Sequence, residues 1–415
     1  MYDICIIGAG PSGLMASIAA SLYGANTLVI DKNKQVGKKL RLTGGGRCNV
    51  TNRQPIDQLI QNIPGNGKFL YSALSQFNNE DIINFFEEHN TPLKEEDHGR
   101  MFPTTNKSKT IVDTLYTTAM KQNVTFALST TVTKITEHAS LFHIKTNDKT
   151  YTARKLIITT GGQTYTYTGS TGDGYQFAKQ FGHHITQLYP TECPLISNDQ
   201  LITSKTLQGL SFSDAQISIL QKQKVILTHR HDLLFTHFGL SGPAALRCSG
   251  HIWQLLQKNQ TVPIEINFYP DITSDMWLQK FQTYQQQNTK KQVSSMLKAE
   301  LPERLAEVIL QIAQIPKNTI SQQLSKQQLM QIIQQLQHFK ININQTWPLE
   351  KAFVTGGGIE LKEINPKTME SKIQPHLFFA GEVLDINGYT GGFNITAAFA
   401  TGYTAGSNAA LSLYA

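Results

Sequence analysis

The apolar positions at the start of the chain predict a strand, a turn, a helix and a second strand. Ile4, Ile6 and Ile7 form a short apolar run, as in a buried strand of a parallel sheet. Glycines follow at once, and a helix is expected to begin near Pro11. The second strand closes at Asp31. This order is typical of the first half of a nucleotide-binding α/β unit.

The spacing of apolar positions changes twice in the middle of the chain. Residues 215–229 and 262–268 alternate apolar and polar positions, as half-buried antiparallel strands do. From about 273 the spacing becomes helical, and Pro302 lies near one expected helix start. One apolar face consists of Leu305, Val308, Ile309, Ile312 and Ile315, and another of Leu329, Ile332, Ile333, Leu336 and Phe339. The middle is therefore expected to be an insertion into the α/β domain.

Composition places few restrictions on function. The 415 residues include 40% hydrophobic and 16% charged residues, and the formal charge of +7 is modest. This charge permits nucleic acid or acidic ligands, but a solvated basic surface is the favoured interpretation. The four cysteines lie far apart without a CxxC pair, so neither a disulfide scaffold nor a metal site is expected. No leader pattern or long apolar run occurs, and we expect a cytoplasmic protein that does not span a membrane.

The first glycine turn has the spacing of a dinucleotide-binding motif. Gly8, Gly10 and Gly13 satisfy G-x-G-x-x-G, and Pro11 and Ser12 begin the expected helix. Gly8 permits a sharp turn, Gly10 lets the backbone approach a pyrophosphate, and Gly13 lets the helix pack closely. The helix directs its free N–H groups at the phosphates, while an acid at position 31 can accept the ribose hydroxyls.

A second glycine-rich stretch, "GKKLRLTGGGRCNVTN" (37–52), admits more than one interpretation. Seven Lys or Arg residues and no acid lie between Lys32 and Arg53, as in a solvated surface loop. Directly after the ribose-binding strand, however, the stretch is expected at the ligand edge of the sheet. We interpret it as a second cradle for the same dinucleotide, in which backbone N–H groups and arginines hold the anion. Its candidate contacts are Lys32, Arg41, Thr43, Gly44, Gly45, Gly46, Arg47, Cys48 and Asn49. For Cys48 a small, half-buried loop residue is favoured over a catalytic thiol.

Together with later motifs, this stretch resembles the FAD-dependent oxidoreductases of the BaiN/YhiN type, which are also described as aminoacetone oxidase-like. This family is related to the fumarate reductase flavoproteins of the glutathione reductase-type superfamily. The motifs are "LIITTGGQTYTYTGSTGDGYQFAKQFGH" (156–183), "LLFTHFGLSGPAAL" (233–246), "AFVTGGGI" (352–359) and "LFFAGEVLDINGYTGGFNITAAFATGYTAG" (377–406). The resemblance implies non-covalent FAD as the dinucleotide. It also implies a Rossmann-like α/β domain with a β-barrel-like insert that carries a small helical bundle.

The expected domain limits follow from these patterns. The FAD-binding domain comprises residues 1–190 and 346–415, the β-barrel-like insert 191–272 and 340–345, and the helical subdomain 273–339.

The resemblance and the strand ends together predict further FAD contacts. Val132 offers backbone atoms to the adenine, and Glu382 accepts hydrogen bonds from the ribityl hydroxyls, although a helix-capping glutamate is its alternative. The start of the last helix directs its dipole at the flavin N1–O2 edge. The predicted contacts here are Val132, Thr160, Gly161, Gly162, Gly381, Glu382, Gly391, Gly392, Phe393, Asn394 and Ile395.

The residues leave the reaction less defined. Where fumarate reductases carry an arginine, the sequence has Tyr389 and Thr390, which argues against a fumarate reaction. His237 is the best titratable candidate for proton transfer, and docking of the insert is its equal alternative. Tyr389 is the second candidate. No second G-x-G-x-x-G occurs, so NAD(P)H is expected at most as a transient donor.

Three classes of function remain. The first is oxidoreduction of a small molecule by hydride transfer, either amine oxidation with O2 or NAD(P)H-dependent reduction of an activated C=C bond. The others are a flavoprotein acting on RNA and a non-enzymatic redox sensor. RNA is disfavoured because the pyrophosphate explains the basic run and no stacking aromatic residues interleave it. The physiological substrate and the oligomeric state cannot be predicted from these patterns.

Overall fold

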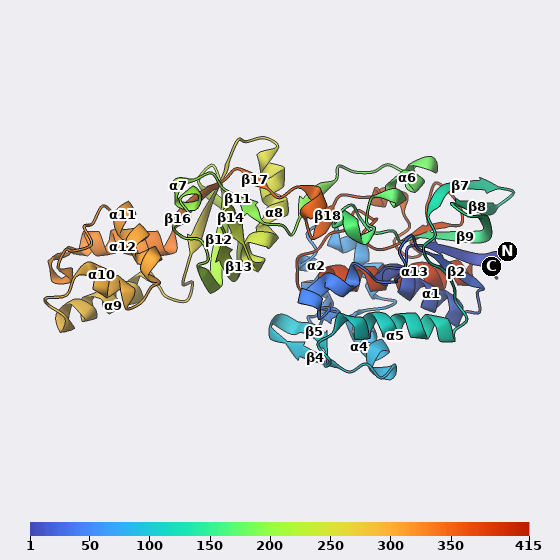
Figure 1. The fold of residues 1–415 in the computed structure, drawn as a ribbon, viewed down its shortest axis with the longest axis horizontal. Helices are drawn as coiled ribbons and strands as arrows, with labels where there is room; N and C mark the ends of the chain where they lie inside the picture. Colours follow the sequence, from blue (N-terminus) through green and yellow to red (C-terminus); the bar gives the residue numbers. More distant parts are fainter. Residues whose placement is uncertain (415) are drawn as a thin grey trace. The chain divides into compact units, whose positions relative to one another are not determined.

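The computed structural model describes residues 1–414 and divides them into two units. Unit 1 comprises Met1–Thr191 and the segment from Leu349 onward, and unit 2 comprises Glu192–Pro348. Figure 1 shows the elements of both. The middle of the chain thus forms its own compact unit, while both ends share the other. The separation of 273–339 from the rest of the insert stays a prediction.

A seven-stranded sheet forms the centre of unit 1. Its order is β6-β2-β1-β9-β8-β7, and β19 pairs with β9 beyond the end of β8. The strands are β1 (Tyr2–Ile7), β2 (Thr27–Ile30), β6 (Thr125–Ala127), β7 (Val132–His138), β8 (Leu141–Thr146), β9 (Thr150–Ile158) and β19 (Leu377–Phe379). Strands β6, β2, β1, β9 and β19 are mutually parallel. This is the Rossmann-like arrangement that the sequence predicted.

Two helices of small residues pack unusually closely in unit 1. In α13 (Phe393–Leu411), a Cβ added at Gly402 would lie 2.4 Å from the Ser12 carbonyl oxygen, and one at Gly406 would lie 2.1 Å from that of Ala16. Both carbonyls belong to α1 (Pro11–Leu22), beside which α5 (Ser108–Lys121) also packs. Glycine is required at both positions because the backbones touch. Figure 1 shows α1 and α13 side by side in unit 1.

Smaller elements complete unit 1. They are α2 (Ile56–Gln61), α3 (Tyr71–Leu74), α4 (Asn79–Glu88), α6 (Asp173–Gln180), the sheet of β3 (Thr51–Asn52), β4 (Leu93–Glu96) and β5 (Arg100–Pro103), and the pair of β10 (Tyr189–Thr191) with β18 (Val354–Gly356).

Unit 2 contains an antiparallel sheet of order β16-β15-β12-β13-β14-β11-β17. Its strands are β11 (Leu195–Ile196), β12 (Ser211–Gln221), β13 (Lys224–Phe235), β14 (Gly239–Ser241), β15 (Val262–Asn267), β16 (Phe339–Ile343) and β17 (Gln345–Thr346). The two end strands are consecutive in the chain, separated by Asn344 alone, so the sheet curls until its edges meet. Helix α8 (Pro243–Leu256) packs against β11 to β15 and β17. This is the barrel-like insert that the sequence predicted.

The remaining helices of unit 2 follow α7 (Gln200–Thr203) and form a group of their own. They are α9 (Ser274–Gln287), α10 (Val293–Lys298), α11 (Glu303–Ile312) and α12 (Lys326–Gln337). Most residues of the two predicted apolar faces lie in the core of the unit, where Leu305, Ile309, Ile332 and Leu336 are fully buried. The prediction is wrong for Ile312, which is 38% exposed at the end of α11. Ile315 and Phe339 are buried but lie beyond the ends of α11 and α12, and Phe339 begins β16. Among the residues described, no helix in either unit combines the length and apolarity that a bilayer crossing requires.

Candidate functional site

The predicted cofactor contacts converge at one edge of the parallel sheet. Strands β1, β2, β9 and β19 end at Ile7, Ile30, Ile158 and Phe379. Because parallel strands end at the same edge, the segments that follow them lie next to one another. These segments contain the first glycine turn, Asp31, Thr160 to Gly162, and Gly381 with Glu382. Segments from both ends of the chain thus form one candidate site.

The first glycine turn is tight at two positions and open at the third. Gly8 has φ of 108°, and its N–H donates to the Ile30 carbonyl at 2.8 Å. A Cβ at Gly13 would lie 1.9 Å from the Gly8 carbonyl oxygen. At Gly10, by contrast, an added Cβ would meet no atom within 4 Å. The turn is closed against the protein and open at the position predicted to face pyrophosphate.

Asp31 is oriented by this turn. Its Oδ2 accepts from the Ala9 N–H at 2.7 Å, and its Oδ1 accepts from the Asn33 N–H at 2.7 Å. The next residue, Lys32, bonds Asp173 at 2.6 Å from Nζ to Oδ2 and also contacts Thr171. Thr171 and Asp173 were not predicted as site residues, although their T-G-D-G turn lies in a motif of the resemblance. These residues extend the site to the start of α6.

The second glycine stretch is an exposed loop with three left-handed glycines. Gly44, Gly45 and Gly46 have φ of 57°, 65° and 84°. The Cys48 N–H closes the loop by donating to the Thr43 carbonyl at 2.9 Å. A Cβ at either of the last two glycines would meet no neighbour within 4 Å. Their backbone is therefore accessible to a ligand, as an anion cradle requires.

Cys48 is fully buried inside this loop. Burial raises the pKa of its thiol to about 12, although a hydrogen bond with Thr43 acts in the opposite direction. A thiol with this pKa is protonated at neutral pH and is a poor nucleophile. The geometry favours the interpretation of Cys48 as a packing residue.

Most charges of the basic stretch are neutralised within unit 1. The ion pairs are Lys32–Asp173, Lys39–Glu382, Arg41–Asp113, Arg47–Glu96, and Arg53 with Glu80 and Glu95. The Arg47 guanidinium also lies over the Phe102 ring, 4.1 Å from its centroid. Contacts of Arg41 and Arg47 with a dinucleotide stay predictions, and the accessible glycine N–H groups are the better-placed donors.

Glu382 also has partners within the protein. Its carboxylate accepts from Lys39 Nζ at 2.8 and 3.0 Å and from the Thr355 N–H at 3.0 Å. Burial alone raises the pKa of the carboxyl, but the Lys39 ammonium and the N–H groups of Thr355 and Gly162 outweigh it and hold the pKa below its ordinary value. Glu382 is therefore an ionised, positioned acceptor, and its contact with the ribityl chain stays a prediction.

The start of α13 lies beside the second glycine loop. Gly391 and Gly392 have φ of 134° and 98°, and a Cβ at Gly392 would lie 3.1 Å from Asn49 Oδ1. The Asn394 side chain bonds the N–H and carbonyl of Gly388 at 2.8 and 2.7 Å and so shapes the loop that carries Tyr389. The first N–H groups of the helix, at Phe393, Asn394 and Ile395, have no partner inside an α-helix and can serve a ligand.

Two further predicted residues belong to other elements. Val132 begins β7 and pairs with Thr146, so its adenine contact stays a prediction. His237 belongs to unit 2, where it is exposed and its ring packs edge-on against Phe238. All predicted cofactor contacts therefore belong to unit 1.

Three buried side-chain oxygens in the described chain test whether FAD fits. Ser12 Oγ, Asn49 Oδ1 and Thr160 Oγ1 are buried without a hydrogen-bond partner. All three belong to the predicted cradle, one each from the first turn, the second loop and the end of β9. Buried polar atoms are rarely left unsatisfied, so a ligand that supplies partners is expected here. The three oxygens and the open glycines fit the ribityl and pyrophosphate groups of FAD.

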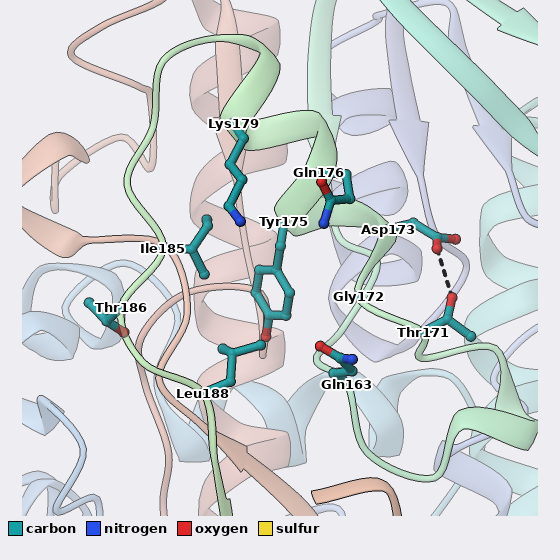
Figure 2. A pocket seen from close by; sticks show the side chains of 10 residues that line it. All are labelled: Gln163, Thr171, Gly172, Asp173, Tyr175, Gln176, Lys179, Ile185, Thr186 and Leu188. Atoms are coloured by element: carbon teal, nitrogen blue, oxygen red, sulfur yellow. Dashed lines mark hydrogen bonds between the residues drawn. The ribbon is translucent and has the colours of Figure 1, made fainter.

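A cavity of about 270 Å³ adjoins these segments. Figure 2 shows its lining, to which Gln163, Asp173, Tyr175 and Lys179 contribute polar groups. The Tyr175 hydroxyl is buried without a hydrogen-bond partner in the described structure. Gln163 directly follows Gly162, so the cavity and the predicted cofactor site share one loop.

The family model of the HI0933-like protein Rossmann domain matches residues 2–408. The chain belongs to this family. It is 32% identical over 97% of its length to a ribosomal RNA dihydrouridine synthase of Escherichia coli (strain K12), of which 96% is covered. It is 27% identical over 99% of its length to a 3-dehydro-bile acid delta(4,6)-reductase of Clostridium scindens, also covered to 99%.

Among solved structures, a 3-ketosteroid delta1-dehydrogenase from Sterolibacterium denitrificans has a TM-score of 0.53, at 11% identity and 99% coverage of both chains. This similarity shows the fold alone. The family membership confirms the resemblance that the sequence motifs indicated, and the chain is an FAD-dependent oxidoreductase of the BaiN/YhiN type.

Proposed function

We propose that this protein reduces the C5=C6 bond of a uridine in ribosomal RNA to dihydrouridine, with NAD(P)H as the electron donor. The observation that carries this proposal is the similarity, over nearly the whole chain, to two ribosomal RNA dihydrouridine synthases at 32% and 30% identity. The proposal reverses the order expected from the sequence, in which a small molecule ranked above RNA.

The relatives support one type of reaction. By their names, two form dihydrouridine and the third reduces double bonds of a 3-keto bile acid. In both substrates the reducible C=C bond is conjugated with a carbonyl group. For uridine, a hydride adds to C6, a proton adds to C5, and the developing negative charge lies on O4. The balance is uridine plus NAD(P)H plus H⁺ giving dihydrouridine plus NAD(P)⁺. Amine oxidation with O2 has no such support.

The chain's own residues hold and orient the cofactor for this reaction. FAD, when bound, supplies the hydride chemistry. The open glycines of both loops and the first N–H groups of α13 are placed to hold its phosphates and ring edge. Ser12, Asn49 and Thr160 gain the hydrogen-bond partners that they lack. His237 and Tyr389 are the proposed candidates for the proton donor to C5.

The bile acid reductase relative supports a second candidate function, the reduction of a small conjugated ketone. One assay with NADPH separates the two. The purified protein is incubated with unmodified ribosomal RNA or with a 3-keto-4-ene steroid, and products are measured by mass spectrometry. A gain of two hydrogens at one uridine, matched by NADPH oxidation, is the expected result. Reduction of the steroid without change in the RNA would replace the proposal with the second candidate.

A further inference from the structure

The structure assigns a ribosomal RNA-binding surface to one end of the helical bundle of unit 2, formed by Lys290, Lys291, Lys317 and Lys326. This proposal rests on the proposed function, because it commits to ribosomal RNA as the partner. It goes further than the proposed function because it names the surface that contacts the RNA backbone. This surface lies in a part of the chain that contributes no residue to the predicted FAD site. We call these four residues the lysine end.

Backbone contacts bring the four lysines together. The Ser321 N–H donates to the Lys291 carbonyl at 2.8 Å, and the Val293 N–H donates to the Thr319 carbonyl at 2.8 Å. The segment after α9 therefore runs beside the segment before α12, which places Lys290 and Lys291 near Lys317.

The fourth lysine follows from the packing of α9 against α12. Gln285 near the end of α9 bonds the Ser321 and Leu324 carbonyls just before α12, while Ser274 at the start of α9 bonds Gln337 at the end of α12. The two helices are therefore antiparallel. Lys326, the first residue of α12, lies at the same end as the loop that follows α9. Figure 1 shows the four helices grouped within the unit.

The charge of the lysine end is not balanced locally. No Asp or Glu occurs at 276–299 or 308–349. All four lysines are exposed, and no carboxylate of the described chain lies within ion-pair distance of any of them. Two other lysines of the bundle are paired instead, Lys280 with Glu300 at 2.7 Å and Lys298 with Glu303. The pKa of the Glu303 carboxyl is lowered chiefly by its hydrogen bond with Lys298, and the charge of Lys317 adds to this effect. Glu303 is therefore already paired with Lys298.

Phosphates match this surface better than an acidic protein groove does. The neighbouring exposed positions are mostly glutamines, whose amides donate hydrogen bonds without charge, among them Gln286, Gln287, Gln292, Gln322, Gln323 and Gln327. Phosphate and sugar oxygens accept most of the hydrogen bonds in protein–nucleic acid contacts, from lysines and amides alike. Contacts of this kind hold and orient an RNA and leave the choice of uridine to the site near the flavin.

The test compares two variants that remove equal charge from the same bundle. K290Q/K291Q removes two lysines of the lysine end, and the control K280Q/K298Q removes two paired lysines. A third variant, K290Q/K291Q/K317Q/K326Q, removes the whole surface. Dissociation constants for a ribosomal RNA fragment are measured between about 50 and 200 mM salt. Circular dichroism and thermal unfolding show that the helices of unit 2 remain folded in each variant, and flavin content and flavin reduction by NADPH without RNA show that unit 1 is intact.

The full variant should raise the Kd about 10- to 1000-fold at low salt, and its log–log salt slope should be less steep by about 3, for four phosphate contacts at ~0.7 to 0.9 each. The control should bind like the unaltered protein.

An unchanged Kd and slope in the full variant would overturn the assignment of the lysine end as the RNA-binding surface, even if dihydrouridine still forms. Binding that depends on these lysines without any dihydrouridine formation would overturn the proposed function and leave the RNA surface standing. If the unaltered protein does not bind the RNA, the lysine end is overturned as well.

Discussion

Lys39 and Glu382 are 343 residues apart in the chain, yet the ammonium nitrogen of one lies 2.8 Å from Oε2 of the other and 3.0 Å from Oε1. The pair joins the second glycine loop to the residue that follows β19. Each side chain keeps only a modest accessible fraction, 24% for the lysine and 20% for the glutamate. It is therefore neither an ordinary surface ion pair nor a fully buried one.

Replacing Lys39 with Met should destabilise the apoprotein by about 1 to 3 kcal/mol at pH 7, the range for charged hydrogen bonds lost in a partly buried setting. The loss leaves the Glu382 carboxylate desolvated without its cation. Urea unfolding followed by circular dichroism measures the change. The control is Lys32→Met, whose pair with Asp173 is more exposed, at 27% and 40%, and should cost about 0 to 1 kcal/mol. Equal losses of stability in both variants would contradict the prediction that the less exposed Lys39–Glu382 pair contributes more than the Lys32–Asp173 pair.

The same pair predicts a pH dependence. The folded pKa of Glu382 is lowered, so its stabilisation is present above the unfolded glutamate pKa of about 4.3 and is lost as the pH falls through the folded value. The stability difference between the unaltered protein and Lys39→Met should therefore be largest near pH 7 and shrink below about pH 4. Unfolding curves at several pH values measure this difference. A difference that grows on acidification has the wrong sign for this assignment.

The first glycine turn separates effects on folding from effects on FAD. Gly13→Ala places a methyl group against the Gly8 carbonyl and should cost about 1 to 3 kcal/mol of stability, as overpacking does. Gly10→Ala meets no protein atom and keeps an ordinary φ of −79°, so its apoprotein should unfold normally. It should nevertheless bind FAD more than tenfold more weakly, because the methyl group occupies the space predicted for pyrophosphate. FAD titration and thermal unfolding distinguish the two variants, and normal FAD affinity in Gly10→Ala would place the pyrophosphate elsewhere.

Asp31→Ala should weaken FAD binding by about 1 to 3 kcal/mol, or roughly 5- to 150-fold, through the loss of a charge-assisted hydrogen bond. Asp31→Asn keeps one acceptor for the Ala9 N–H and should retain the shape of the turn. If both variants bind FAD weakly, the ribose contact requires the charge. If only the alanine variant does, the carboxylate acts through the turn. Asp3→Ala, at the opposite end of β1, is the control and should leave the affinity unchanged.

Local patterns predicted the parts of the fold that depend on neighbouring residues. The unit from β1 to β2, the faces of α11 and α12, and the antiparallel insert follow from spacing and from glycine positions. Contacts between distant segments were not predictable in this way. Nothing near Lys39 or Arg47 in the sequence indicates that Glu382 and Glu96 neutralise them, so the basic stretch appeared more available to a ligand than it is. Asp173 was missed for the same reason, since its partner Lys32 lies 141 residues away.

The proton donor to the substrate is the remaining test of the site, and its two candidates lie in different units. Tyr389 is buried in the loop before α13, where its N–H donates to the Asn62 carbonyl at 2.9 Å. His237 is exposed in the loop between β13 and β14.

His237→Gln and Tyr389→Phe should each keep FAD bound, because both preserve size and remove only a transferable proton. The variant that removes the donor should lower kcat for RNA reduction by about 10² to 10⁴, the usual loss for a general acid, and should lose one limb of the pH–rate profile. Flavin reduction by NADPH should be unaffected, because it precedes proton transfer to the substrate. If His237→Gln instead loosens FAD or lowers the Tm with an intact pH profile, the histidine docks the insert. If neither variant changes kcat, the proton comes from solvent or from another residue, and both assignments fail.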